Sequence, residues 1–175
     1  MIKAIAAATA ITIGLSGCAS LNQFPATKLA SGTLHTASGV PAGTVVLMTR
    51  GDDVNISVAV IGLPQGVHGL HLHMVGSCEA PDFKSAGGHL NPHGMQHGIA
   101  NPAGSHLGDL PNLVVDSFGA GTVTATLRDS RIAAEAALFD ADGTAIVVHA
   151  QPDDDKTDPS GNSGARIACG VLKRG

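Results

Sequence analysis

Seven of the nine histidines lie between Val67 and Asp109, and no other feature constrains the fold as strongly. The seven are His68, His71, His73, His89, His93, His97 and His106. Imidazole is the commonest protein ligand for copper and zinc. So many imidazoles in one stretch predict a metal centre with more than one ion, which the fold must hold together.

Composition favours short strands over long helices. The chain has 175 residues, enough for one domain, but only four Phe and no Trp or Tyr. We therefore expect a core of Val, Ile, Leu and Ala, and the 23 glycines predict frequent turns. The net charge of −4 and the lack of a basic cluster argue against a nucleic-acid partner.

Eight segments show the alternating or valine-rich patterns of β-strands. They are 28–35, 43–49, 55–61, 67–75, 113–116, 121–127, 145–149 and 166–172. In the fourth segment, alternation places His71 and His73 side by side on one face. Leu70, Leu72 and Met74 are then expected on the other face.

The remaining segments are expected to form one helix and two long loops. An alanine-rich segment, 133–140, predicts a short helix. Segments 76–112 and 152–164 lack periodicity, and long loops in small domains are usually functional. Because strands do not alternate with helices, we expect an all-β antiparallel sandwich or barrel in a single domain.

The N-terminus is expected to direct export. Lys3 and an apolar stretch too short to span a bilayer precede Leu15-Ser16-Gly17-Cys18, which resembles the lipobox of bacterial lipoproteins. This predicts a signal peptide over 1–17, a lipidated Cys18 beginning a tether over 18–27, and a folded domain over 28–175. A plain secretory signal is the alternative. With Ala19 following, the lipid would suit the outer membrane of a cell envelope.

Export also changes the interpretation of the remaining cysteines, Cys78 and Cys169. Two cysteines in an oxidising compartment favour a disulfide, which would stabilise the fold by roughly 4–5 kcal/mol in the chain-entropy model. Metal ligation by thiolate is the alternative, but neither cysteine has a Cys-x-x-Cys neighbour.

The histidines and one aspartate divide into two ligand sets. His89, His97, His106 and Asp109 form a reasonable tetrahedral zinc set. His71, His73 and the distant His149 form an all-nitrogen set that suits copper. Imidazolate can bind metals through both nitrogens, so two sites this close predict a shared ligand.

Four segments resemble the copper-zinc superoxide dismutases in their bacterial exported form. They are Gly69-Leu70-His71-Leu72-His73, Gly87-Gly88-His89-Leu90-Asn91-Pro92, His106-Leu107-Gly108-Asp109-Leu110-Pro111 and Gly161-Asn162-Ser163-Gly164-Ala165-Arg166-Ile167-Ala168-Cys169-Gly170-Val171. The resemblance runs from about residue 30 to residue 172, with every expected ligand position filled. It implies a flattened, immunoglobulin-like Greek-key β-barrel with two long functional loops.

The resemblance also implies the roles of individual residues. The copper ligands it implies are His71, His73, His89 and His149, and the zinc ligands are His89, His97, His106 and Asp109. Cys78 and Cys169 would form the intrasubunit disulfide. Arg166 would orient the superoxide anion beside the copper, and His89 would carry a proton. Asp153 would link His71 and His97, which fixes their ring orientation.

The implied reaction is dismutation of superoxide to oxygen and hydrogen peroxide by Cu(II)/Cu(I) cycling, which would protect the cell envelope. Because the chain is acidic overall, attraction of the anion would have to be local. Members of the family often carry tyrosine where Asp155 stands, so an added negative charge could weaken that attraction. Bacterial relatives occur as monomers and as homodimers, and both remain open.

The same residues also allow three other interpretations of the protein's function. A histidine-rich sequestering loop, a metal-storage lipoprotein and a non-catalytic relative of the dismutases would each use the same residues without turnover. We expect His68 to pack behind the site, and His35 and His93 to lie at the surface. Asp154 and Asp155 are expected in a solvated loop.

Overall fold

The computed structural model describes residues 25–175, so the predicted signal segment, Cys18 and most of the tether lie outside the described residues. The strands are β1 (Thr27–Thr36), β2 (Pro41–Arg50), β3 (Asp53–Val60), β4 (Gly66–His68), β5 (Leu70–His73), β6 (Leu113–Val115), β7 (Gly121–Thr126), β8 (Ala145–His149), β9 (Arg166–Val171) and β10 (Lys173–Arg174). One α-helix, α1 (Arg131–Leu138), and one 3-10 turn, η1 (Lys84–Ala86), complete the elements.

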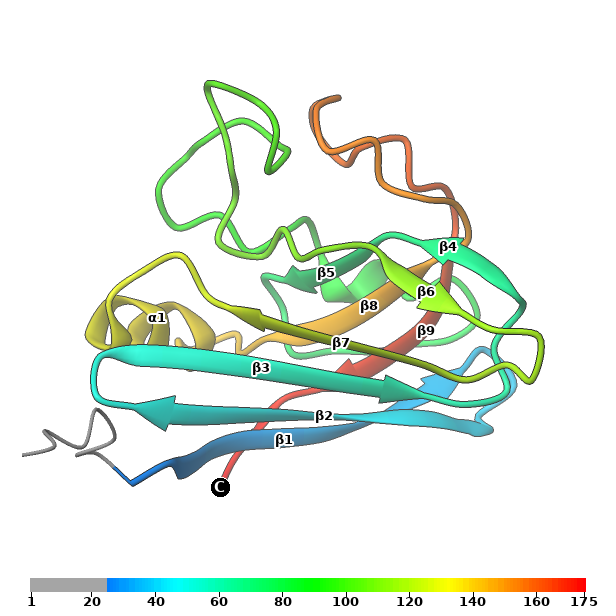
Figure 1. The fold of residues 1–175 in the computed structure, drawn as a ribbon, viewed down its shortest axis with the longest axis horizontal. Helices are drawn as coiled ribbons and strands as arrows, with labels where there is room; N and C mark the ends of the chain where they lie inside the picture. Colours follow the sequence, from blue (N-terminus) through cyan, green and yellow to red (C-terminus); the bar gives the residue numbers. More distant parts are fainter. Residues whose placement is uncertain (1–24) are drawn as a thin grey trace, which may run out of the picture.

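Most strands form one curled antiparallel sheet with the order β5-β8-β9-β1-β2-β3-β7, and β10 pairs with β1. The chain crosses repeatedly between the two edges of this sheet, as Greek-key connections do. A second sheet pairs β4 with β6. Because β4 leads into β5 and β6 leads into β7, this small sheet joins the two edges (Figure 1). The predicted all-β Greek-key barrel is confirmed.

Aliphatic side chains fill the barrel, as the composition predicts. In β3 the alternation places Ile56, Val58 and Val60 inside, each at most 5% exposed. Leu34 of β1 and Leu47 of β2 are fully buried beside them. Each such side chain contributes roughly 1.5–3 kcal/mol when fully buried, so aromatic residues are not needed to hold this core.

The predicted fourth strand is broken into two. β4 ends at His68 and β5 begins at Leu70, because the backbone N–H and C=O of Gly69 bond to Gln151 and His149 instead of continuing one ladder. β5 ends at His73, so Met74 lies outside the strand in which it was expected to share one face with Leu70 and Leu72. The N–H of Met74 donates to Gly88 in the long loop, and its side chain is 48% exposed.

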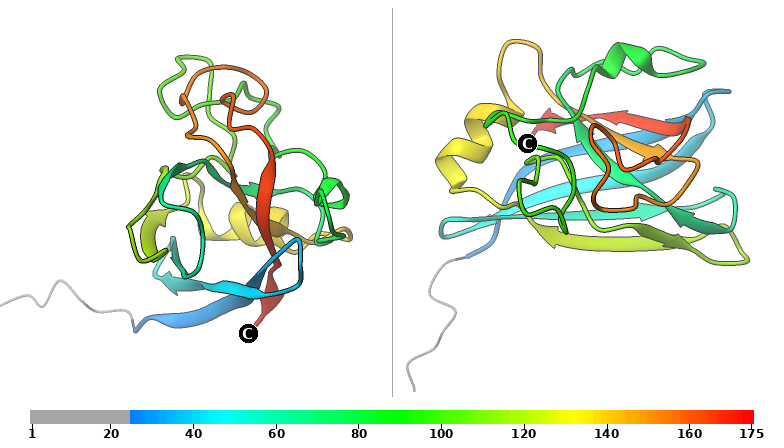
Figure 2. Two further views of the ribbon diagram at one scale, coloured as in Figure 1. Left: turned by 90° about the vertical axis from the view of Figure 1, so that its right-hand side faces the viewer. Right: turned by 90° about the horizontal axis from the view of Figure 1, so that it is seen from above.

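Both predicted loops rise from the same side of the barrel (Figures 1 and 2). The first loop runs from β5 to β6 and the second from β8 to β9. They touch where the N–H of Ala100 donates to the carbonyl of Asp155 at 3.0 Å. The first loop also contains η1, which the absence of periodicity did not predict. Among residues 25–175, no helix is long and apolar enough to cross a membrane.

The helix begins two residues earlier than expected. The side-chain oxygen of Ser130 accepts the N–H of Ala133 at 3.3 Å and caps α1 at its N-terminus. Such a cap satisfies one of the donors that a helix leaves free at its start. The alanine-rich pattern located the helix, but this cap determines where it begins.

Candidate metal centre

Four buried histidines meet on the side of the barrel that the two loops cover (Figure 1), and we call them the copper set. β5 carries His71 and His73, β8 ends at His149, and the first loop brings His89 to His73 through an isolated β-bridge. Their potential ligand atoms all lie within 4.8 Å of one another. The period-two geometry of β5 and the pairing of β5 with β8 therefore place three of the four side chains.

Backbone carbonyls orient two of these rings. His73 Nδ1 lies 3.0 Å from the carbonyl of Gly87, and His149 Nδ1 lies 3.2 Å from that of Gly164. A carbonyl only accepts, so each Nδ1 carries the proton and donates it. The two Nε2 atoms, 3.4 Å apart, are left with free lone pairs that point into the same space.

The first loop supplies a second set, which we call the zinc set: His89, His97, His106 and Asp109. Oδ1 of Asp109 lies 3.1, 3.0 and 3.2 Å from Nδ1 of His89, His97 and His106, respectively. Its other oxygen accepts the backbone N–H groups of Gly98 and His106 at 2.9 and 3.0 Å. This carboxylate is thus fixed by the loop while one oxygen faces all three rings.

His89 belongs to both sets. Its ring centroid lies 4.0 Å from that of His71 on one side and 5.1 Å from that of His97 on the other. Nδ1 faces Asp109, whereas Nε2 is buried and has no hydrogen-bond partner among the described residues. The two nitrogens of one ring therefore point at two different clusters, as a bridging imidazole requires.

Asp153 of the second loop connects the two sets from behind. Its Oδ2 accepts from His71 Nε2 at 2.6 Å, and its Oδ1 accepts from His97 Nε2 at 3.0 Å. Asn112 holds the backbone of Asp153 by two hydrogen bonds, at 2.8 and 2.9 Å. Gly161, at φ +62, packs so close that a Cβ there would overlap Oδ1 of Asp153. The second loop therefore orients one imidazole of each set.

The donor atoms fit metal ions. Nδ1 of His71 and Nε2 of His89 are buried and lack hydrogen-bond partners among the described residues. An unpaired buried polar atom costs about 1–3 kcal/mol, so such atoms in one place call for a ligand. Lone pairs of this kind, on rings whose opposite nitrogen is anchored by an acceptor, are what copper and zinc bind.

Burial keeps three of the four copper-set imidazoles, His73, His89 and His149, neutral. It lowers the pKa of His73 to about 2, that of His149 to about 3 and that of His89 to about 4, and neighbouring imidazoles add to the effect. A neutral imidazole has the free lone pair that a metal needs.

On the zinc side the carboxylates dominate. Burial opposes protonation of His97, but hydrogen bonds to Asp109 and Asp153 raise its pKa to about 10. Burial of Asp109 is likewise outweighed by hydrogen bonds from His89 and His97, which hold the pKa of Asp109 far below its usual range. This side therefore carries fixed negative charge beside its imidazoles, which attracts a divalent cation.

A cavity of about 520 Å³ opens onto both sets. Its lining includes His73, His89, His106, His149 and Arg166. Among the described residues that line it, Arg166 is the only lysine or arginine. NH1 of Arg166 donates to the carbonyl of Phe83 and NH2 to that of Gly87, both at 2.6 Å. The guanidinium is thus held at the edge of the copper set.

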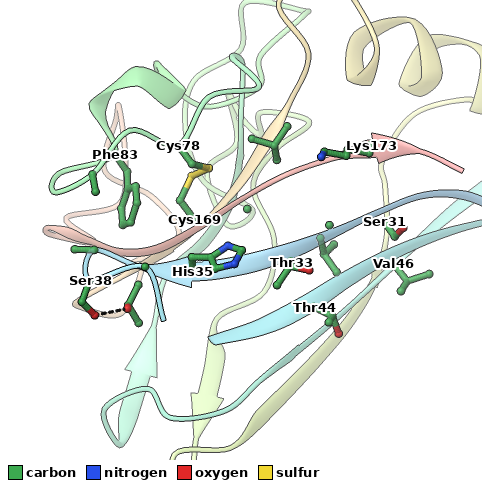
Figure 3. A pocket seen from close by; sticks show the side chains of 18 residues that line it. Ser31, Thr33, His35, Ser38, Thr44, Val46, Cys78, Phe83, Cys169 and Lys173 are labelled. Carbon is green, nitrogen blue, oxygen red and sulfur yellow. Dashed lines mark hydrogen bonds between the residues drawn. A yellow bond between two sulfur atoms is a disulfide. The ribbon is translucent and has the colours of Figure 1, made fainter. Parts of the chain in front are cut away.

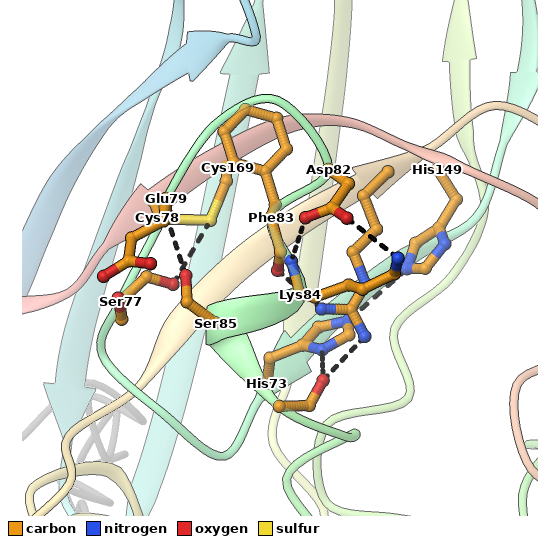
Figure 4. The surroundings of a disulfide bond; sticks show 12 residues. His73, Ser77, Cys78, Glu79, Asp82, Phe83, Lys84, Ser85, His149 and Cys169 are labelled. Carbon is orange, nitrogen blue, oxygen red and sulfur yellow. Dashed lines mark hydrogen bonds and ion pairs between the residues drawn. A yellow bond between two sulfur atoms is a disulfide. The ribbon is translucent and has the colours of Figure 1, made fainter.

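The disulfide between Cys78 and Cys169 is present, with Cα atoms 5.7 Å apart. It ties the first loop to β9, the strand that begins at Arg166. Figure 4 shows the disulfide, Phe83 and His73 gathered around this part of the loop. The cross-link therefore fastens the segment whose carbonyls hold the arginine.

A larger hollow, of about 1090 Å³, lies on the other side of the disulfide and is not the metal centre. Figure 3 shows it over β1, β2 and β9, with His35 and Lys173 at its wall. None of the copper-set or zinc-set residues lines it. It offers a single imidazole and no carboxylate, so it lacks a metal-binding constellation.

The remaining histidines lie as expected. His68 is 3% exposed and its two ring nitrogens lie 2.8 and 2.9 Å from the carbonyls of His149 and Pro64, so it packs behind the copper set. His93 is exposed and pairs with Asp129 at 2.8 Å. His35 is exposed at the hollow described above.

The second loop differs from the expectation of a solvated acidic run. Asp155 is half-buried at φ 61, and its carbonyl holds the first loop at Ala100. Its side chain does not line the metal cavity. The pKa of Asp155 is raised by burial and by the nearby charge of Asp153. Asp154 is exposed, as expected, and caps the turn at Thr157.

Two supporting residues were missed by sequence reasoning. Asn112 holds Asp153, and Asp158 accepts the N–H of His97 at 2.6 Å across the two loops. Both lie in irregular segments, where no periodicity indicates which side chain turns inward. A polar residue directly after the Leu110-Pro111 end of the first loop was the only available signal for Asn112.

The fold and the site define a class of protein: a disulfide-bonded β-barrel with two adjacent clusters of potential metal ligands that share one histidine. The family model described as copper/zinc superoxide dismutase matches residues 41–172. The chain belongs to the copper/zinc superoxide dismutase family.

Curated relatives agree. The Cu-Zn superoxide dismutase 2 of Aquifex aeolicus is 41% identical over 146 residues, covering 80% of this chain and 84% of the relative. The Cu-Zn superoxide dismutase of Caulobacter vibrioides is 40% identical over 148 residues, covering 82% and 85%. A SOD-like protein from Bacillus subtilis has a solved structure with TM-score 0.77 and 38% identity, covering 84% of this chain and all of that one.

Proposed function

We propose that this protein converts two superoxide anions and two protons to oxygen and hydrogen peroxide. The copper set would hold copper and the zinc set would hold zinc. The observation that carries the proposal is the buried His89, whose two nitrogens face the two sets. When bound, copper would supply one-electron redox chemistry, and zinc would supply a fixed positive charge without redox change.

The chain's own contribution begins with proton handling at His89. Its Nε2 faces the copper set and its Nδ1 faces Asp109 of the zinc set. Burial holds the pKa of His89 at about 4, so this ring gives up a proton readily at neutral pH. Nε2 is therefore placed to hold a proton briefly and return it to reduced oxygen at the cavity.

Arg166 would bind and orient the anion. Its guanidinium lines the cavity beside His73 and His149, and the carbonyl of Gly87 accepts from both Arg166 and His73. One carbonyl therefore sets the position of the cation relative to a copper-set ring. A single arginine at the wall of the cavity attracts a small anion locally, even in an acidic protein.

We also propose the domain division and export inferred from the sequence: a signal peptide over 1–17, a tether over 18–27 and the enzyme domain over 28–175. The disulfide supports an extracytoplasmic location, since disulfides form and persist in oxidising compartments. Cys18 would carry the lipid, with outer-membrane sorting. In bacterial cells grown with labelled palmitate, the protein should be labelled, and Cys18→Ser should move it to the soluble fraction; an unlabelled soluble wild type contradicts the anchor.

One experiment tests the activity. The purified protein, loaded with metals, should contain one copper and one zinc per chain, because the structure offers one complete ligand set for each. It should remove superoxide at a rate that falls with added salt, as steered association does. Bound metals without turnover would refute the enzyme and support storage or a non-catalytic role.

A variant pair isolates the role of Arg166. Arg166→Ile should keep both metals, because the guanidinium bonds only to carbonyls in the described structure, and should lose most activity. Arg131→Ile removes an exposed cation from α1, outside the metal cavity, and should change activity little. Equal activity of the two variants at low salt would overturn the assignment.

A further inference from the structure

Two methionines stand at the opening of the metal cavity. Met74 and Met95 both line it, and they are 48% and 41% exposed. The third methionine in residues 25–175, Met48, is half-buried in β2 and does not line the cavity. The proposed reaction uses neither thioether.

Both side chains lie on backbone that is tied to the copper set. Met74 directly follows His73, and a Cβ on Gly87 or Gly88 would lie 3.8 or 3.9 Å from its sulfur. The sulfur therefore rests on the segment that leads into His89. Met95 is held by Asn91, which donates to the carbonyl of Met95 at 2.8 Å and accepts its N–H at 3.0 Å.

The chemistry of a thioether selects one oxidation state of copper. Soft sulfur ligands prefer Cu(I), whereas imidazoles also suit Cu(II) and zinc. A thioether has no proton to lose, so it can bind copper without the deprotonation that other ligands require. Two exposed methionines that line one cavity with His73 and His149 offer a weak outer site followed by a strong inner one.

We propose that Met74 and Met95 form an entry site for Cu(I) at the mouth of the cavity, from which the ion passes by ligand exchange to the copper set. The transfer changes ligands only, and the copper stays Cu(I) throughout. The proposal rests on the proposed copper occupancy of the inner set. The entry site favours Cu(I) over zinc, whose usual ligands are thiolate, imidazole and carboxylate.

The test measures copper uptake by zinc-loaded, copper-free protein without oxygen. Cu(I) is supplied as its bicinchoninate complex, and loss of the complex's absorbance is followed by stopped flow. Met74→Leu/Met95→Leu, a nearly volume-conserving change, should take up Cu(I) about tenfold more slowly. Its final copper content should equal that of the wild type. Met48→Leu is the matched control and should load at the wild-type rate.

X-ray absorption supplies a second readout. With a second equivalent of Cu(I) per chain, wild-type protein should show sulfur scattering that the double variant lacks. Equal uptake rates, or a lower final copper content in the double variant when one equivalent of Cu(I) is supplied, would overturn the entry site. Dismutase activity of the fully loaded proteins is measured separately. Inactive wild type with slowed uptake in the variant refutes the proposed function and leaves the entry site standing.

Discussion

Replacing Asp153 by Asn should weaken copper binding more than zinc binding. Oδ1 of Asp153 accepts two N–H groups, from His97 Nε2 at 3.0 Å and from Asp155 at 2.6 Å. Oδ2 accepts one, from His71 Nε2 at 2.6 Å. The amide of Asn has only one oxygen that can accept. Placed where Oδ1 of Asp153 lies, this oxygen satisfies two donors, whereas placed at Oδ2 it would satisfy one. With the oxygen at Oδ1, the NH2 group faces His71 Nε2, donor against donor.

His71 must then lose its partner or move its proton to Nδ1, the buried atom that would bind copper. Loss of such an outer partner typically costs 10–100-fold in metal affinity, or about 1.4–2.8 kcal/mol. We therefore expect Asp153→Asn to weaken copper binding by about 10–100-fold and zinc binding by less. Competition against chelators of known affinity measures both.

Asp154→Asn is the control for this prediction. The Asp154 carboxylate accepts backbone N–H groups of Lys156 and Thr157 and the side chain of Asn162, in an exposed turn. Its variant should bind both metals as the wild type does. Copper affinity unchanged in Asp153→Asn, or zinc affinity reduced more than copper affinity, would refute the reasoning.

Three further predictions concern the supports of the site. Gly161→Ala should lower metal content and melting temperature, because its Cβ would overlap the carboxylate of Asp153. Gly62→Ala is the control: this glycine also has a positive φ but has open space around it, so the variant should show only the backbone cost of about 1–2 kcal/mol. Cys78→Ser with Cys169→Ser should reduce unfolding free energy by up to roughly 4–5 kcal/mol, and should reduce activity more than copper content because the loop that holds Arg166 is released. In urea titrations of metal-free protein, stability should fall as pH drops below 6.5, because burial lowers the pKa of three copper-set imidazoles to about 2–4 and the unfolded chain then binds more protons. Each prediction has an outcome that would contradict it. These outcomes are equal melting temperatures of the two glycine variants, full activity without the disulfide, and constant stability of the metal-free protein from pH 7 to 5.

Local patterns in the sequence predicted most of the fold. Alternation in β3 follows directly from the two faces of a strand, and β8 is a short apolar run rich in β-branched residues. Both elements could therefore be located without tertiary information. Alternation also paired His71 with His73. It failed at Gly69 and Met74, where hydrogen bonds to the two loops replace the sheet ladder. Those partners are distant in sequence, so no local pattern reports them.

The two ligand sets could be predicted from the sequence, because histidines and an aspartate at this spacing have few roles other than metal binding. The residues that hold the ligands in place were harder to predict, because an Asn or Asp in a loop can serve many different purposes. Asn112 and Asp158 act through one or two long-range hydrogen bonds, and their residue types alone do not distinguish them from solvated neighbours. A site's chemistry is therefore easier to predict from sequence than the contacts that make the chemistry precise.

Gly87 shows how one backbone position joins these contacts. Its carbonyl accepts from His73 Nδ1 and from Arg166 NH2, so it orients a copper-set ring and the anion-binding cation together. At φ +73, with Met74 and Val75 side-chain atoms 3.1 Å from an ideal Cβ, the position suits only glycine. The disulfide fastens the loop that presents this carbonyl. Oxidation of the cysteines, ring orientation at copper and the position of the arginine therefore depend on one another through a single peptide group.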